Sequence, residues 1–158
     1  MEKIKCTGKV VIFTQFAEMA KLLIKELSKY NPLLIMGDVS AEDRQKVIDL
    51  FTYDKKYKIM VSTDAGAYGL NLQSASYIFM YDTPWSIAKL MQREDRAHRI
   101  GQQKPVTVYN LIAKNSIDEY VAKVLHKKQR ISVDILKDDE RLEDMGITEE
   151  DINEILRI

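Results

Sequence analysis

Residues 9–14 read KVVIFT, a short run of β-branched and aromatic side chains that is typical of a buried strand. Apolar residues then recur at helical spacing from Ala17 to Tyr30, where the pair Asn31-Pro32 interrupts the pattern. A second apolar run follows at residues 33–36. This part of the chain therefore predicts a strand, a helix and a second strand.

The same alternation continues along the chain. Ser40 has the position of a helix N-cap, and Asp43 stands three residues later, close to the capping-box pattern. Because parallel strands need crossover helices, continued alternation predicts an α/β fold with a mainly parallel sheet. The further strands are expected at residues 58–62, 77–81 and 106–112, and the further helices at residues 86–98 and 117–136.

The last part of the chain differs in character. Residues 137–141 read KDDER, a run of charges that is typical of a solvated linker. Thr148 and the three acids that follow it have the pattern of a helix start. The sequence therefore predicts a domain over residues 1–136, followed by a charged linker and a short C-terminal helix over residues 137–158.

Composition limits the classes of function. Lys+Arg and Asp+Glu both number 24, so a contact with nucleic acid must come from a local patch rather than from overall charge. A single cysteine, Cys6, excludes a disulfide framework within the chain and fits a reducing, intracellular setting. His98 and His126 are too few and too far apart in sequence to predict a metal site. Since no apolar run approaches ~20 residues, the sequence predicts no membrane span.

Ligands of an open parallel sheet bind beyond the carboxyl ends of its strands, so the loops there are candidate sites. Ser62 and Thr63 end the third expected strand, and Gly66 and Gly69 follow. Glycines let backbone N–H groups approach a phosphate, but the same pattern is typical of a tight turn, and both interpretations stay open. The loop at residues 36–44 leads into a helix N-terminus, which attracts phosphate, but its acids favour ordinary capping.

A second candidate site lies in the helix expected at residues 86–98. Gln92, Arg96 and Arg99 follow at i, i+4 and i+7 and share one face. Two arginines one turn apart can hold a triphosphate and stabilise charge on a transferring phosphoryl group. The alternative is a solvated face with Glu94 and Asp95 as ion-pair partners.

The order of these segments resembles the C-terminal helicase lobe of Swi/Snf-type superfamily 2 DNA translocases. Residues 13–16 (FTQF) resemble motif IV, residues 62–72 (STDAGAYGLNL) resemble motif V and residues 92–102 (QREDRAHRIGQ) resemble motif VI. The resemblance covers about residues 9–130. It implies a three-layer RecA-like fold, similar to P-loop NTPases, with a C-terminal helical extension that includes a brace-like helix over residues 117–136.

The resemblance also implies roles for single residues. Arg96 and Arg99 would be arginine fingers that reach the γ-phosphate of ATP held by another lobe. Gln92, Gly69 and Asn71 would lie at the nucleotide cleft.

Five further residues would meet duplex DNA. Gln15, Ser40, Ser62 and Thr63 would contact its phosphate backbone. Trp85 would lie near the DNA path, although a core position on the rim of the sheet is equally compatible with its sequence.

The chain also departs from the family pattern. Arg93 stands where the family often has a small residue, and we expect it at an exposed helix position. The sequence has no G-x-x-x-x-G-K-[ST] loop and no Asp-Glu-x-His-type strand end. The resemblance therefore implies an ATP-hydrolysing DNA translocase in which a partner N-terminal RecA-like lobe, in the same or a separate chain, holds Mg²⁺.

Alone, this chain is expected to be inactive. The alternatives are a stand-alone DNA- or protein-binding module and a lobe of an RNA helicase. The expected location is the cytoplasm of a prokaryotic or phage-infected cell, or the nucleus of a eukaryote.

Overall fold

Five short strands pair in parallel to form one sheet. The structure, a computed structural model, describes residues 8–64, 74–95 and 105–135, together with residues 147, 148, 150, 151 and 153. The strand order is β2-β3-β1-β4-β5, and all neighbouring strands are parallel, which confirms the predicted α/β fold. The strands are β1 (Lys9–Thr14), β2 (Leu33–Ile35), β3 (Ile59–Thr63), β4 (Ala75–Met80) and β5 (Thr107–Asn110).

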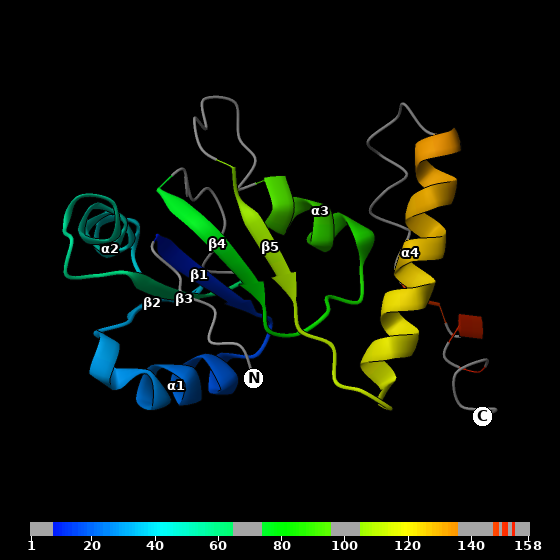
Figure 1. Cartoon of the computed structure of the whole chain (residues 1–158), viewed down its shortest axis with the longest axis horizontal. Coiled ribbons are helices and arrows are strands. Elements are labelled where there is room, and N and C mark those ends of the chain that lie inside the picture. The colour runs from blue at the N-terminus through cyan, green and yellow to red at the C-terminus, as the bar shows by residue number, and fades with distance from the viewer. Residues whose placement is uncertain are drawn as a thin grey trace.

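Helices cover both faces of this sheet (Figure 1). The first, α1, lies against β1, β2 and β3 on one face. On the other face, Phe13 of β1 packs in a cluster with Phe51 of α2, and the guanidinium of Arg93 in α3 lies over the Phe13 ring. The sheet is therefore the middle of three layers. The helices are α1 (Ala17–Glu26), the short 3₁₀ helix η1 (Ser28–Tyr30), α2 (Ala41–Tyr53), α3 (Ile87–Asp95) and α4 (Ile117–Ile135).

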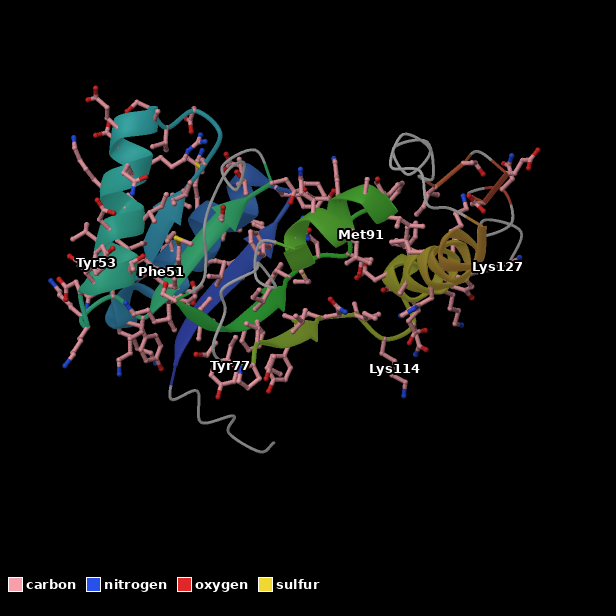
Figure 2. The ribbon with its side chains drawn as sticks, turned by 90° about the horizontal axis from the view of Figure 1, so that it is seen from above. Phe51, Tyr53, Tyr77, Met91, Lys114 and Lys127 are labelled. Atoms are coloured by element: carbon pink, nitrogen blue, oxygen red, sulfur yellow. The ribbon has the colours of Figure 1, made fainter. Side chains whose placement is uncertain are left out.

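The main apolar core lies between the sheet and α2. Phe51 faces the strands and is buried, whereas Tyr53, two positions later, is exposed on the outer side of the helix (Figure 2). Burial of such large side chains is the main stabilising contribution to a domain of this size. The buried members of the cluster are Val11, Phe13, Ile35, Phe51, Met60, Ala75, Ile78 and Met80.

A local capping residue fixes the start of α2, and a contact from β1 fixes its end. Asp43 donates its backbone N–H to the Ser40 hydroxyl at 3.1 Å, which confirms the predicted N-cap. At the other end, Lys9 of β1 donates from Nζ to the backbone carbonyls of Phe51 and Thr52, the latter at 2.9 Å. A cation at this position also interacts favourably with the helix dipole. Lys9 thereby fixes α2 to the middle strand of the sheet.

The helix predicted over residues 17–30 is shorter than expected. It ends at Glu26, and Ser28–Tyr30 form a 3₁₀ turn. The following Pro32 disfavours a right-handed helix at Asn31, which takes a left-handed conformation with φ 50° that asparagine tolerates better than most residues. The boundary is therefore set by the Asn31-Pro32 pair, as the sequence indicated, but the last turn before it is tightened.

The helix α4 stands beyond α3, away from the sheet (Figure 1). A second, smaller apolar cluster joins the two helices through Ile87, Val121 and Leu125, and Ile147 packs against it. Met91 of α3 lies on the side that faces α4 (Figure 2). Residues near the C-terminus thus contribute to the packing between α3 and α4.

A capping contact fixes this C-terminal segment. Thr148 donates its backbone N–H to the Asp151 carboxylate at 2.7 Å, and Asp151 returns its own N–H to the Thr148 hydroxyl at 3.3 Å. The same carboxylate accepts from Lys128 Nζ of α4 at 2.6 Å. The predicted helix start at Thr148 is therefore confirmed, and α4 supplies its counter-charge.

The contacts of Asp151 should make the free energy of unfolding depend on pH in the acid range. Its burial works against ionisation, but the hydrogen bonds from Lys128 and Thr148 outweigh it and lower the pKa of Asp151 from 3.8 to about 2. A lowered pKa stabilises the folded state above about pH 4, and this contribution of about 2 kcal/mol is lost as the pH falls toward 2. In urea unfolding at pH 5 and pH 2.5, Asp151→Asn should lack this part of the acid dependence.

The control for this prediction is Glu150→Gln, which removes an exposed neighbouring carboxylate. It should retain the wild-type acid dependence. Equal acid dependence in wild type and Asp151→Asn would contradict the assigned contact.

Candidate functional site

The strand order reverses its direction between β1 and β4. The chain leaves β1 through α1 toward β2 on one side, and leaves β4 through α3 toward β5 on the other. In open α/β sheets, ligands bind at the carboxyl edge where the strand order reverses in this way. The residues that follow β1, β3 and β4 meet at this edge.

Arg93 of α3 connects those strand ends. Its Nε donates to the Asp64 carboxylate, directly after β3, at 2.7 Å. Its two terminal nitrogens donate to Asp82, the second residue after β4, at 3.0 Å for the backbone carbonyl and 3.3 Å for the carboxylate. One planar guanidinium therefore holds α3 against the ends of two strands.

Asp82 extends the network to β1. Its carboxylate accepts the hydroxyl hydrogen of Thr14, the last residue of β1. It also accepts the backbone N–H of Gln15, with nitrogen–oxygen distances of 3.0 and 3.1 Å. Thr14 in turn accepts the N–H of Phe16 at 3.3 Å. The first turn after β1 is thus ordered by a carboxylate that comes from β4.

The network is largely shielded from water. The side chain of Arg93 is 2% exposed, that of Asp64 is 20% exposed and that of Asp82 is 14% exposed. The guanidinium carbon lies 6.0 Å from the centre of the Phe13 ring, within the range of a cation–π contact. One cation here faces two carboxylates, and among the described residues the buried Asp64 Oδ2 has no hydrogen-bond partner. Removing the cation would leave two partly buried negative charges close together.

The expectation for Arg93 was wrong. The sequence suggested an exposed helix position, whereas the side chain is buried at the carboxyl edge. The structure differs because the inner face of α3 packs on polar strand ends rather than on an apolar surface. Asp64 and Asp82 carried the missed signal, since they follow β3 and β4, the two strands on either side of β1, and two acids at the same edge of a sheet favour a shared cation.

The residues expected to contact DNA follow four neighbouring strands. Ser40 begins the helix after β2, Thr63 ends β3, Gln15 follows β1 and Trp85 follows β4. Because all the strands are parallel, these positions lie along one edge of the sheet. Ser40 is exposed and Gln15 is half-buried, while Thr63 is largely buried.

The burial of Ser62 and the exposure of Trp85 change what was expected of these two residues. Ser62 is fully buried, and its hydroxyl donates to the backbone carbonyl of Thr63 at 3.1 Å. That burial argues against the predicted DNA contact of Ser62, because its alternation along β3 directs it into the sheet layers. Trp85 is 45% exposed, which excludes a core position, and its carbonyl accepts the N–H of Ile147 at 3.1 Å.

Gln92 is the one predicted nucleotide-cleft residue within the described part of the chain. It is exposed on α3, next to the buried Arg93. The other predicted residues of the nucleotide site lie outside the described residues: Gly69, Asn71, Arg96 and Arg99.

The described residues offer neither a candidate metal site nor a membrane-spanning helix. They contain no group of three or more His, Cys, Asp or Glu side chains that could hold a metal ion. The helices built from them include none that is long and apolar enough to cross a membrane.

Comparison with known proteins defines the class. Residues 2–101 match the family described as the helicase conserved C-terminal domain, and the chain belongs to this family. Within that class it is a C-terminal lobe of the Swi/Snf type of superfamily 2 helicase, with the RecA-like arrangement of such lobes.

Three relatives support this assignment. The ATP-dependent helicase fft1 of Schizosaccharomyces pombe is 33% identical over 146 residues, which is 90% of this chain and 16% of fft1. The crystal structure of the C-terminal part of the Fun30 ATPase domain aligns with a TM-score of 0.69 and 35% identity, covering 73% of this chain and 38% of that one. The Sulfolobus solfataricus SWI2/SNF2 ATPase core in complex with dsDNA aligns with a TM-score of 0.63 and 29% identity, covering 88% of this chain and 32% of that one.

Arg93 should be essential to the stability of the carboxyl edge. Breaking a buried ion pair by removing one partner costs about 3–5 kcal/mol. Arg93→Met should therefore lower the free energy of unfolding by that amount in urea titrations, because Asp64 and Asp82 lose their shared cation.

Lys89→Met is the matched control on the same helix, since Lys89 is exposed. It should change the free energy of unfolding by less than about 0.5 kcal/mol. A loss below about 1 kcal/mol in Arg93→Met would show that the network does not hold the strand ends together.

Proposed function

We propose that this chain is the C-terminal motor lobe of an ATP-dependent translocase on double-stranded DNA. It works with an N-terminal RecA-like lobe, in the same or a separate chain. The observation that carries the proposal is the carboxyl edge of the sheet. Gln15, which the family resemblance assigns to DNA, lies there on a turn that Asp82 and Arg93 tie to α3, the helix that carries Gln92, which the resemblance assigns to ATP.

ATP would bind between the two lobes. Arg96 and Arg99 would reach its γ-phosphate and stabilise the charge that develops on the transferring phosphoryl group. Gln92, Gly69 and Asn71 would line this lobe's side of the cleft. Support comes from α3, which presents Gln92 at its surface and is described as far as Asp95, the residue before Arg96 in the sequence. The donors on this side are amide and guanidinium groups, which suit phosphate oxygens.

Mg²⁺ and the β-phosphate would be held by the N-terminal lobe. The sequence of this chain contains no Walker A pattern, and an arginine finger contributes only when the rest of the site is assembled. The isolated chain would therefore not hydrolyse ATP. In this proposal residues 1–136 form the lobe, and residues 137–158 form a linker and a short helix.

Duplex DNA would be gripped through its phosphates. Gln15, Ser40 and Thr63 would contribute backbone or side-chain contacts, and Trp85 would lie along the DNA path. Such contacts carry no sequence information, which suits a motor that moves along DNA. The solved relative from Sulfolobus solfataricus, described as a complex with dsDNA, supports this assignment by its likeness to the chain. The place of action would be the cytoplasm of a prokaryote or the nucleus of a eukaryote.

Arg96→Ala and Arg99→Ala test the proposed arginine fingers. In the assembled two-lobe protein, each change should lower the DNA-stimulated kcat for ATP hydrolysis by a factor of ~10³–10⁵. Binding of duplex DNA should remain, because the fingers act on the nucleotide.

Lys89→Ala serves as the control, since it removes an exposed positive charge from the same helix. It should leave kcat near the wild-type value. Wild-type kcat in both arginine variants would contradict the assignment. Stimulation by RNA in place of duplex DNA would favour an RNA helicase lobe.

A further inference from the structure

Arg93 stands between two parts of the lobe that the proposed function keeps separate. One part is the first turn after β1, where Gln15 is a proposed DNA contact. The other is α3, which presents Gln92 and leads in sequence to Arg96. A direct chain of hydrogen bonds joins them: the Gln15 N–H donates to the Asp82 carboxylate, and that carboxylate accepts from Arg93.

The same guanidinium reaches the third loop of this edge. Asp64 accepts from Arg93 Nε and is the last described residue before the segment that contains Gly69 and Asn71. The three nitrogens of this side chain thus donate to three different acceptors: the Asp64 carboxylate, the Asp82 backbone carbonyl and the Asp82 carboxylate. A planar guanidinium fixes such directions rigidly, whereas a lysine ammonium acts as a single point charge.

A purely stabilising role would not require this arrangement. Buried ion pairs are often no more stabilising than well-packed apolar residues of similar volume, because the charges must be desolvated. The side chain of Arg93 is 2% exposed and contacts Asp64 and Asp82, which follow β3 and β4. Its directional bonds there define the position of α3 relative to the ends of these strands. Positioning therefore explains the network better than stability alone.

We infer that Arg93 is a positioning residue that couples the DNA-contacting turn after β1 to the arginine fingers that follow α3. This inference rests on the proposed function of the lobe. When DNA contacts the turn at Gln15, the position of that turn is transmitted to α3 through Asp82 and Arg93. The guanidinium, whose side chain is 2% exposed, holds α3 against Asp64 and Asp82, and through α3 it would align Arg96 and Arg99.

The test uses Arg93→Lys in the assembled two-lobe protein. Lysine keeps the positive charge between Asp64 and Asp82, which favours a folded variant, but it cannot make all three directional bonds. The variant should lose about 10²-fold in DNA-stimulated kcat, since small misplacements of catalytic groups can cost that much. The KM for ATP and the Kd for duplex DNA should change by less than about threefold. Arg93→Met should show the same split, measured at a temperature where it is folded.

Phe51→Leu is the control for lost stability. It weakens the core under α2, away from the carboxyl edge, and should keep wild-type kcat per folded molecule. Near wild-type kcat in both folded Arg93 variants would overturn the inference, as would a loss that matches only the unfolded fraction.

Arg96→Ala, measured in parallel, separates this inference from the proposed function. Loss of activity in Arg96→Ala together with active Arg93 variants would refute the positioning role alone. Wild-type kcat in Arg96→Ala would refute the proposed function and the positioning role with it.

Discussion

The buried contact of Arg93 with Asp64 and Asp82 is the constraint on which the carboxyl edge depends. Two carboxylates follow β3 and β4, the strands on either side of β1, and without a shared cation they would repel each other in a poorly solvated place. The guanidinium neutralises this repulsion and fixes α3 at the same time. The turn after β1 joins the network through Thr14 and Gln15. Arg93 and Asp82 together therefore set four elements of the lobe (β1, β3, β4 and α3) relative to one another.

The rest of the lobe supports this edge by ordinary packing. Lys9 joins the end of α2 to β1, and the apolar cluster around Phe13 and Phe51 fills the layer between them. On the far side, α4 and the segment around Ile147 pack against α3. Since α3 is held from the sheet by Arg93 and from α4 by apolar contacts, its orientation is constrained on two sides.

Much of the fold could be predicted from the sequence because local patterns determine it. The run at residues 9–14 matched β1 in full, and Ser40 capped α2 as expected. Arg93 and Ser62 could not be placed in this way, because the direction of a side chain depends on which surface its element packs against. The expectations for Arg96, Arg99, Gly69 and Asn71 stay predictions, since these residues lie outside the described part of the chain.

The central claim is that this lobe completes an ATPase site that it cannot form alone. The most direct measurement is the rate of ATP hydrolysis by the chain alone and by the chain assembled with its N-terminal lobe, each with and without duplex DNA. We expect no hydrolysis by the chain alone, and DNA-stimulated hydrolysis by the assembly. Hydrolysis by the chain alone, or an assembly whose rate ignores duplex DNA, would contradict it.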